Sequence, residues 1–530
     1  MTMPDSRTTR LPLTAAQSGM WYAQRLDPDN PIYNGGQYWE IVGQFDPDVF
    51  EQAVRCVIRE TDALRTRFIE DQDGVRQIVE EDPPRVVRYL DVSREPDPRA
   101  AAEEWMRADL ARPVDLATAS PADLSAFALI EMRPDHFLWY FRCHHIVLDG
   151  YGSALVARRV AEVHTALVQG APVAPGDWQS LRDLVHADEE YRSSARHAQD
   201  RAYWRARLED RPAVRSLAGR TAPMPHRLGR VTGHLTPELT ARLRDMASRA
   251  AVPWPPALTA AFAAYLQNLT GGEDIVVGLP VTARVGQAAR ATPGMLSNVL
   301  PVRLRMSGDT TFTELLTQVS TRMRAALKHQ RHRYEDMRRD LGLVGEDEQL
   351  VGPQVNIMLF GDRPSFAGVP ATPHTLNLGP VRDLSAVFQD QGDGEPLRID
   401  FEANPALYSE DELTLHRERF LSFVERLVAA GADRPLGALD AMLPGERARS
   451  LDHDADDAPV AHPDRTLVEL FEEQVVRCGD RVAVCCGEES VTYAELNGRA
   501  NRLARWLVGR GVGPEDVVAV CLPRSVDLVV

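Results

Sequence analysis

The stretch FRCHHIVLDGYGS, from Phe141 to Ser153, brings two adjacent histidines, one carboxylate and two glycines together within a few residues. The run HFLWYFRCHHIVL, which overlaps it, is almost continuously apolar and aromatic, as is typical of a β-strand covered on both faces. After it, apolar residues recur at helical spacing until Gly170: Val156, Val160, Val163 and Leu167. The histidines are therefore predicted to lie where a buried strand leads into a helix, a common position for functional residues.

His144 and His145 are the first candidates for chemistry, and their adjacency limits what they can do. Neighbouring side chains on a strand point to opposite faces, so the pair is not expected to bind one metal ion. One imidazole can therefore face a reaction site, where its neutral form acts as a hydrogen-bond partner or as a general base. The alternative is that both are ordinary core histidines.

Asp149 and Gly150 follow the pair and precede the predicted helix. Asp149 could orient an imidazole or hold the loop in a buried ion pair. The structural role is favoured, because a carboxylate at a helix start also stabilises that helix end. Gly150 allows the backbone to approach a ligand closely and could direct its N–H group toward developing negative charge.

The composition limits the possible classes of protein. A chain of 530 residues predicts two to four domains, and 44% hydrophobic with 26% charged residues is typical of a soluble globular protein. The formal net charge of −17 and the interleaving of Arg with Asp and Glu argue against nucleic-acid binding. The N-terminus does not resemble a signal peptide, and the longest apolar stretch, from Ala251, is interrupted by prolines and too short to cross a bilayer.

The chain has six cysteines: Cys56, Cys143, Cys478, Cys485, Cys486 and Cys521. They form no CxxC pair and no zinc-site spacing, so reduced thiols and no bound metal are expected. Cys143 shares a strand face with His145, which leaves a covalent acyltransferase mechanism as one alternative. A small buried hydrophobic side chain is the favoured interpretation, because free cysteine is among the most buried residue types.

Helix and strand signals alternate through two successive parts of the chain. A Pro/Gly-rich stretch, VQGAPVAPGDWQS, separates them, and the second part contains apolar strands such as EDIVVGLPV and NVLPVRLRM between helical segments. An acidic stretch rich in Pro and Ala, LDHDADDAPVAHPD, then predicts a linker. The pattern after it indicates a helix, a strand pair, a helix and a strand, which is too little for an independent domain and looks truncated.

HHIVLDG, residues 144–150, resembles the HHxxxDG signature of the condensation domains of nonribosomal peptide synthetases, whose lobes are similar to chloramphenicol acetyltransferase. Further segments resemble other motifs of that family in the expected order: LTAAQSGMWYAQ, RETDALRTRF, YRSSARHAQDRAYW, GLPVTARVG, GMLSNVLPVRLR, RHRYEDMRRDLG and GPQVNIMLF. After them, VTYAELNGRANRLARWL resembles the first core motif of an adenylation domain. The phosphate-binding loop of that domain is not in this sequence, so productive ATP binding is not expected.

The resemblance implies an α/β fold of the two-layer α+β type. Two chloramphenicol-acetyltransferase-like lobes would form a V-shaped pseudo-dimer with a central tunnel, and a small partial α/β segment would follow at the C-terminus. Residues 1–10 are expected to be a flexible N-terminus, 11–178 the N-terminal lobe and 179–435 the C-terminal lobe. Residues 436–463 are the expected linker, and 464–530 the N-terminal fragment of an adenylation domain.

The activity that the resemblance implies is acyl transfer: a carrier-bound acceptor amine attacks a carrier-bound donor thioester and forms an amide, without an acyl-enzyme intermediate. The intact His144–His145 pair argues against the heterocyclisation relatives, which carry an aspartate motif instead. Epimerisation relatives do not lead directly into an adenylation domain. Several motifs resemble the branch found in siderophore and hybrid-pathway synthetases, so siderophore or antibiotic biosynthesis is the expected context. Ester formation with a hydroxyl acceptor, or an inactive carrier-recruiting module, are the alternatives.

The resemblance also implies roles for single residues. His145 either accepts a proton from the attacking amine or positions its nitrogen, and His144 orients and packs. Asp149 is expected to pair with Arg284, in PVTARVG, as a structural link between the lobes. The neighbours Ser297 and Asn298 are expected at the floor of the tunnel.

The resemblance implies no permanently bound cofactor, because the phosphopantetheine arms of carrier proteins deliver both substrates. The donor carrier is expected in trans, on another polypeptide. The acceptor carrier and the adenylation domain are expected in the same module. The chain itself is expected to be a cytoplasmic monomer that binds neither nucleic acid nor membranes.

Overall fold

The structure is a computed structural model, and it describes residues 10–72, 74–81, 87–343, 345, 349–358, 363–390, 394–446, 466–487 and 489–530. The chain divides into two compact units, Met1–Leu443 and Pro444–Val530. Most of the expected N-terminal segment (1–9) and most of the expected linker (447–463) lie outside the described residues. Within the described ranges, no helix is both long enough and apolar enough to cross a membrane.

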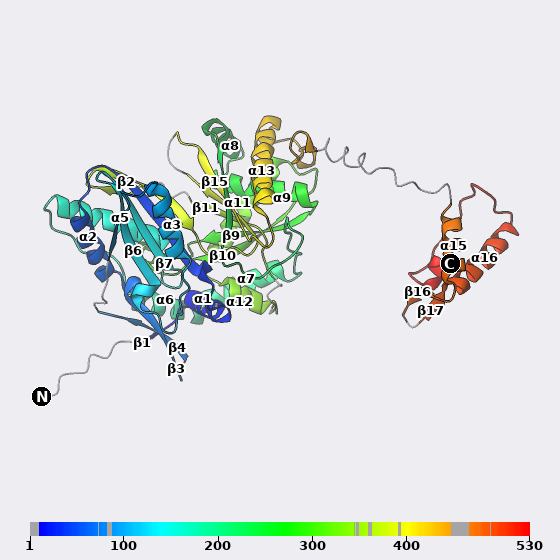
Figure 1. The fold of residues 1–530 in the computed structure, drawn as a ribbon, viewed down its shortest axis with the longest axis horizontal. Helices are drawn as coiled ribbons and strands as arrows, with labels where there is room; N and C mark the ends of the chain where they lie inside the picture. Colours follow the sequence, from blue (N-terminus) through cyan, green and yellow to red (C-terminus); the bar gives the residue numbers. More distant parts are fainter. Residues whose placement is uncertain are drawn as a thin grey trace. The chain divides into compact units, whose positions relative to one another are not determined.

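The first lobe is built on a six-stranded sheet with the strand order β12-β13-β2-β7-β6-β5 (Figure 1). Its strands are β2 (Asn34–Val42), β5 (Arg88–Asp91), β6 (Ser125–Arg133), β7 (His136–His144), β12 (Ser365–Phe366) and β13 (Val369–Asn377). β7 runs antiparallel to β2 on one side and to β6 on the other. Its residues 137–144 are all buried, as the apolar run in the sequence predicts.

Both faces of this sheet are covered by helices. α2 (Pro47–Glu60) and α5 (Gly150–Val168) pack on the face that carries Trp39 and Trp139, whose rings stack at 4.3 Å. α3 (Pro98–Leu110) packs on the opposite face. The lobe also contains β1 (Arg10–Pro12), α1 (Ala15–Leu26), η1 (Pro31–Tyr33), η2 (Asp62–Arg65), β3 (Thr66–Asp71), β4 (Gly74–Val79) and α4 (Pro121–Leu124). The two covered faces explain why β7 lacks the polar alternation of a surface strand.

The second lobe has its own six-stranded sheet, with the order β10-β9-β11-β14-β15-β8 (Figure 1). Its strands are β8 (Gly229–Leu235), β9 (Asp274–Val281), β10 (Asn298–Arg305), β11 (Gln354–Met358), β14 (Leu384–Gln389) and β15 (Leu397–Ala403). β11 runs parallel to β9 and β14, and the other pairs are antiparallel. The sheet is therefore mixed.

The helices of the second lobe also lie on both sides of its sheet. One face packs against α8 (Pro237–Arg249), α9 (Pro255–Thr270), α11 (Phe312–Lys328) and α13 (Glu410–Ala430). The other packs against α7 (Ala195–Leu208) and α12 (Tyr334–Asp340). The shorter elements are α6 (Leu181–Ser193), α10 (Gln287–Ala291) and η3 (Leu436–Ala438). Nearly every residue of α9 is buried, so the longest apolar stretch of the sequence is a core helix.

The antiparallel strands β12 and β13 cross between the lobes, and β13 is the crossing strand that leads to the site. β13 lies inside the range expected for the second lobe, yet it pairs antiparallel with β2 of the first sheet, from Ala371 opposite Ile41 to Asn377 opposite Gly36. Arg230, on β8 of the second lobe, donates hydrogen bonds to the carbonyls of residues 375 and 376. The crossing strand therefore carries the turn that follows it to the end of β7, where the histidines lie.

The second unit contains α15 (Leu467–Cys478), the hairpin β16 (Val482–Cys486) and β17 (Glu489–Thr492), α16 (Tyr493–Val508) and α17 (Val526–Val529). The helix, the strand pair and the second helix are those that the sequence predicts. The expected final strand is not formed: residues 517–523 are irregular, and Val517 is 97% exposed. A strand needs a neighbour for its backbone hydrogen bonds, and this segment pairs with none of the described strands.

Candidate active site

His145 directly follows β7, between the strand and α5. Its backbone N–H donates to the carbonyl of Tyr33 at 2.8 Å, and its ring Nε2 lies 2.8 Å from the carbonyl of Leu378. A carbonyl can only accept, so Nε2 carries the proton and donates it. Nδ1 is buried and has no partner among the described residues. Burial lowers the pKa of His145 below its usual 6.5, so the ring is neutral at pH 7.

His144 uses both ring nitrogens inside the protein. Nδ1 accepts the backbone N–H of Ile146 at 3.1 Å, and Nε2 donates to the side-chain oxygen of Gln24 at 3.1 Å. Gln24 in turn donates to three carbonyls in the loop after α1. Burial lowers the pKa of His144 to about 3, which keeps it neutral. Because both ring nitrogens of His144 bind protein groups, the side chain packs and orients the segment around it.

Asp149 joins the two lobes. Its Oδ1 accepts the N–H of Gly152 at 2.7 Å and caps α5. Its Oδ2 accepts from Arg284 Nη1 at 2.6 Å and from the backbone N–H groups of Leu296 and Ser297 at 3.0 and 2.9 Å. The predicted pair of Asp149 with Arg284 is therefore present, and both side chains are only 1% exposed. All four hydrogen bonds go to groups other than the histidines.

Asn298 holds a neighbouring segment of its own lobe. Its Nδ2 donates to the carbonyls of residues 330 and 332, at 2.9 and 2.8 Å, and its Oδ1 accepts the N–H of Tyr334. Arg333, from that segment, donates to the carbonyls of Leu296 and Ser297. Since residues 296 and 297 also donate to Asp149, Asn298 and Arg333 brace the loop that binds this carboxylate.

Gly152, which the sequence does not single out, has the stronger steric reason to be glycine. A Cβ atom on Gly152 would lie 2.9 Å from Leu148 and 3.1 Å from the backbone N of Gly294. A Cβ atom on Gly150 would meet nothing within 4 Å. Packing between the lobes thus requires the second glycine, while Gly150 is exposed at the first position of α5.

Cys143 is buried on β7, and its Sγ lies 3.5 Å from the hydroxyl of Ser153. Burial raises the pKa of this thiol to about 11, although the contact with Ser153 opposes the shift. The thiol therefore stays protonated at neutral pH. Since the thiolate is the nucleophilic form, Cys143 is poorly suited to covalent catalysis.

The turn after the crossing strand reaches His145 from the other side. Gly379 has a φ of +111°, and a Cβ atom there would lie 2.5 Å from His145 Nε2. Asn377 fixes the turn: its Nδ2 donates to the carbonyls of Ile32 and Asn34, and its Oδ1 accepts the N–H of Gly379. Sequence reasoning missed this turn, because one glycine among 35 is no signal and Leu378 lies 233 residues from His145.

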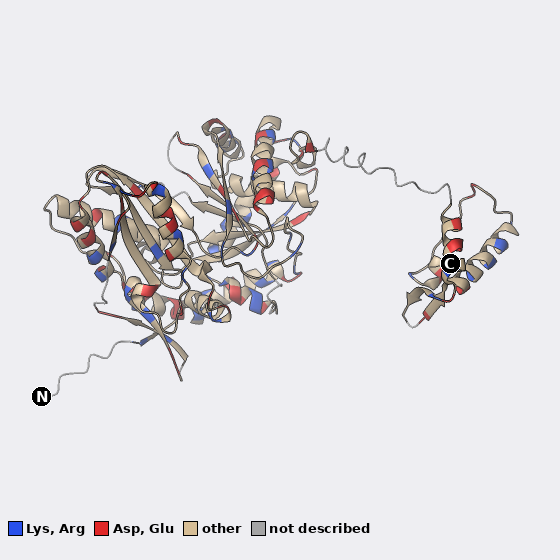
Figure 2. Ribbon diagram, in the orientation of Figure 1, with Lys and Arg blue, Asp and Glu red and all other residues tan. Residues whose placement is uncertain are grey.

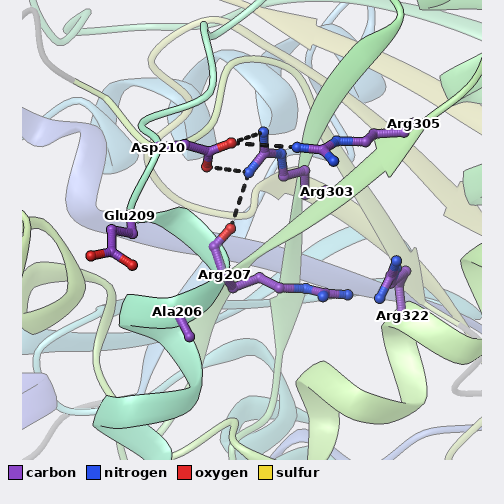
Figure 3. Close-up of a pocket in the computed structure, with 7 residues that line it drawn as sticks. All are labelled: Ala206, Arg207, Glu209, Asp210, Arg303, Arg305 and Arg322. Atoms are coloured by element: carbon purple, nitrogen blue, oxygen red, sulfur yellow. Dashed lines mark hydrogen bonds and ion pairs between the residues drawn. The ribbon is translucent and has the colours of Figure 1, made fainter.

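Two surface cavities are lined by residues other than the histidines. One of about 480 Å³ is lined by Ala206, Arg207, Glu209, Asp210, Arg303, Arg305 and Arg322 (Figure 3). There Asp210 accepts from Arg303 at 2.7 Å and forms an ion pair with Arg305 at 3.4 Å. The other, of about 230 Å³, is lined in part by Asp109 and Arg142, which form a buried ion pair. Over both lobes, basic and acidic residues are interspersed, as the sequence indicates (Figure 2).

The site can therefore offer one neutral imidazole at the junction of two lobes. Around His145 lie the carbonyl of Leu378, the backbone of β2 at Gly35 and the turn at Gly379. The described residues place no activated nucleophile on its strand face, since Cys143 remains a protonated thiol. Such a site can orient a nucleophile or exchange a proton with it, but its residues are not arranged for an acyl-enzyme.

Comparison with protein families gives two matches. The family model described as Condensation domain matches residues 7–449, and the one described as AMP-binding enzyme matches residues 471–530. Together they cover most of the chain, including the histidine pair and the crossing strand.

Several curated proteins are similar over nearly the whole chain. A dimodular nonribosomal peptide synthase of Bacillus subtilis (strain 168) is 42% identical over 99% of this chain and 22% of its own length. The isonitrile lipopeptide synthase of Streptomyces coeruleorubidus is 43% identical over 98% of this chain and 35% of its own. Enterobactin synthase component F of Escherichia coli (strain K12) is 32% identical over 98% of this chain and 40% of its own length. The chain thus spans two fifths or less of the length of these relatives.

Solved structures resemble the first unit. The starter condensation domain of rhizomide synthetase, in a mutant form in complex with C8-CoA and Leu-SNAC, is 41% identical with a TM-score of 0.76. The match covers 82% of this chain and 97% of that one. The first condensation domain of the calcium-dependent antibiotic synthetase, in complex with a substrate analogue, is 34% identical with a TM-score of 0.76. The match covers 82% of this chain and 100% of that one.

Proposed function

The chain belongs to the condensation-domain family of nonribosomal peptide synthetases, acyltransferases that form amide bonds, and we propose that it transfers a carrier-bound acyl group directly to a carrier-bound acceptor amine. The observation that carries the proposal is the neutral, buried His145, placed between the lobes beside a protonated Cys143. The fold is the two-lobed, chloramphenicol-acetyltransferase-like one that the sequence predicts.

In this proposal His145 contacts the attacking nitrogen. The thioester is already electrophilic, so bringing the two tethered ends together does most of the work and can supply up to about 7–11 kcal/mol. A free α-amine has a pKa near 7.7–8.0, and burial beside a neutral imidazole favours its uncharged, nucleophilic form. In this tautomer Nε2–H donates to the carbonyl of Leu378, and the lone pair that can accept a proton lies on Nδ1, which is buried without a partner among the described residues.

The other site residues have structural parts in the proposal. Asp149 and Arg284 tie the strand–helix junction to the second lobe, and Asn298 braces the loop of Ser297. Gly150 is the exposed first residue of α5, with open space where a Cβ atom would lie, and in the proposal its N–H donates to the thioester oxygen. His144 supports the backbone at Ile146.

We also propose that phosphopantetheine arms of partner carrier proteins deliver both substrates, and that an adenylation domain of the same module supplies the acceptor. The match of residues 471–530 to the AMP-binding family supports this arrangement. Delivery of the donor carrier in trans, a monomeric state and a cytoplasmic location stay predictions from the sequence.

The proposal is tested by single-turnover mass spectrometry. A carrier loaded with an octanoyl or an aminoacyl group is mixed with the chain and a panel of amine and hydroxyl acceptors, including an aminoacyl-SNAC. C8-CoA and Leu-SNAC, bound by the 41% identical starter domain, guide this choice. Amide product is expected from the wild type and from Cys143→Ala.

Three outcomes would count against the proposal. An acylated mass of the wild-type chain, together with loss of product in Cys143→Ala, would establish a covalent mechanism. Product with hydroxyl acceptors alone would establish ester formation, the second candidate from the sequence. Donor and acceptor that remain unreacted across the panel would favour the inactive, carrier-recruiting alternative.

Gly379→Ala is expected to lower the rate of amide formation by about 100-fold, because a methyl group 2.5 Å from Nε2 must push the imidazole aside. A displacement of about 1 Å in a reacting group can cost that factor. The measurement is the single-turnover rate, with the melting temperature as a check on folding.

Gly394→Ala is the matched control for this variant. Gly394 also has a positive φ, +85°, but a Cβ atom there would meet nothing within 4 Å. Both variants carry the same kind of backbone strain, so a selective loss of rate in Gly379→Ala would come from the contact with His145. Equal rates in the two variants would show that the turn does not position the catalytic histidine.

A further inference from the structure

A cluster of metal-ligating side chains lies in the second lobe, away from the histidine pair. One nitrogen each of His197 and His332 and one carboxylate oxygen of Asp336 lie within 4.8 Å of one another. His197 comes from α7, His332 lies just before α12, and Asp336 is on the first turns of α12. The cluster therefore joins two helices that are 135 residues apart along the chain at these histidines, and no motif in the sequence connects them.

His332 gives the strongest sign that the cluster binds something. Its side chain is only 1% exposed. Its Nε2 lies 3.3 Å from Asp340, while its Nδ1, within the described part of the chain, has no hydrogen-bond partner. Leaving a buried ring nitrogen without a partner costs free energy, and a bound cation would remove that cost. The ring of His197 lies 5.3 Å from that of His332, centroid to centroid.

The surrounding groups resemble the outer shell of a metal site. A metal-bound histidine commonly donates its other ring N–H to a carboxylate, and Asp340 is in that position for His332. Asp340 is itself held by Arg201 at 2.6 Å. On Asp336, Arg339 donates to Oδ1 at 2.6 Å, which leaves Oδ2 as the ligand atom. The side of the cluster at His197 is partly exposed, so an ion can enter from solvent.

We propose that His197, His332 and Asp336 form a binding site for a divalent transition-metal ion of the zinc type. Two imidazoles and a carboxylate suit Zn²⁺, which binds such ligands at about 2.0–2.2 Å. Their ligand atoms lie within 4.8 Å of one another, so binding one ion at that distance requires the partly exposed His197 and Asp336 side chains to rotate toward His332. Water fills the remaining coordination position. The sequence predicts no bound metal from its cysteines and from His144 and His145, and this cluster contains none of those residues.

The ion would brace the loop at the candidate active site. Residue 332 accepts a hydrogen bond from Asn298 through its carbonyl, and Arg333, the next residue, donates to the carbonyls of Leu296 and Ser297. That loop supplies two of the N–H donors to Asp149. A cation that fixes His332 against α7 thus stiffens the second-lobe side of the junction. Its role is structural, and the site does not depend on the proposed acyl transfer.

The test uses the full chain without a polyhistidine tag, freed of metal with a chelator. Co²⁺ is titrated with detection of its d–d absorption, and Zn²⁺ by calorimetry. Binding of one ion per chain is expected, together with a rise in melting temperature on adding Zn²⁺. His197→Gln and Asp336→Asn, at partly exposed positions that are safe for folding, are expected to abolish the Co²⁺ spectrum. Asp340→Asn is expected to weaken Zn²⁺ binding by about 10–100-fold.

His186→Gln is the matched control, because His186 lies on the neighbouring helix α6, is 70% exposed and has its Nδ1 3.3 Å from the carboxylate of Glu190. It should bind Co²⁺ and Zn²⁺ like the wild type. The proposal is overturned if the wild type binds no stoichiometric ion. It is equally overturned if His197→Gln and Asp336→Asn, shown to be folded by circular dichroism, bind as the control does.

Discussion

Replacing His145 by alanine is expected to lower the single-turnover rate of amide formation by about 10²–10⁴-fold, the usual contribution of a general base or of a group that holds the nucleophile. The ring lies at the lobe junction, and its buried Nδ1 has no partner among the described residues. Its removal also frees the carbonyl of Leu378. Cys143→Ala is the control, because Cys143 lies two residues before His145 and on the same strand face. This variant should keep wild-type activity.

His145→Gln separates the two roles that remain open for this residue. The glutamine amide can still donate a hydrogen bond in place of Nε2–H, but it cannot take up a proton at neutral pH. A rate as low as that of His145→Ala assigns proton transfer to the imidazole. A rate close to that of the wild type assigns positioning. Wild-type rates in both variants would remove His145 from the mechanism.

The pH profile gives an independent check on the same residue. Burial lowers the pKa of His145 from 6.5, so the imidazole is already in its neutral form above pH 6.5. The rate should therefore rise with pH through the pKa of the acceptor amine, near 7.7–8.0 in its free form. A profile that instead follows a group near 6.5, and loses that step in His145→Gln, would mean that the ring is not buried as described.

Arg284→Met is expected to lower the free energy of unfolding of the condensation domain by about 3–5 kcal/mol, because it leaves a buried carboxylate without its counter-ion. Asp149 and Arg284 are each 1% exposed and lie 2.6 Å apart. The three backbone N–H groups that also donate to Asp149 reduce the loss but do not supply a charge. The measurement is the midpoint and slope of urea unfolding followed by tryptophan fluorescence.

Arg249→Met is the control for this prediction. Arg249 forms an ion pair of similar length, 2.8 Å, with Asp245, but the two side chains are 80% and 55% exposed. Solvent screens such a pair, so its loss should leave the unfolding midpoint unchanged. A double variant of Asp149→Asn with Arg284→Met should be less destabilised than the sum of the single variants. Additive losses would mean that the two side chains do not interact.

Several features of the site were predictable from the sequence because they depend on neighbouring residues. The apolar run and the helical spacing placed His144 and His145 at the end of a buried strand, and strand geometry separated their side chains. The pairing of Asp149 with Arg284 came from the resemblance of two motifs to a family, since nothing local connects residues 135 positions apart. In the second unit, the expected last strand was wrong, because an apolar run becomes a strand only beside a partner.

The sequence by itself determined the strand–helix junction, the order of the family motifs and the histidine pair that they point to. Periodicity and helix capping depend on a few neighbouring residues, so the junction can be recognised from a short stretch of sequence. The motifs are recognised in the same way, one short segment at a time. Only the tertiary structure decided that β13 crosses into the first sheet, that Leu378 and Gly379 meet His145, and that His197 lies beside His332. Those contacts exist only when two lobes have packed, because the free energy of packing depends on surfaces that are distant in sequence.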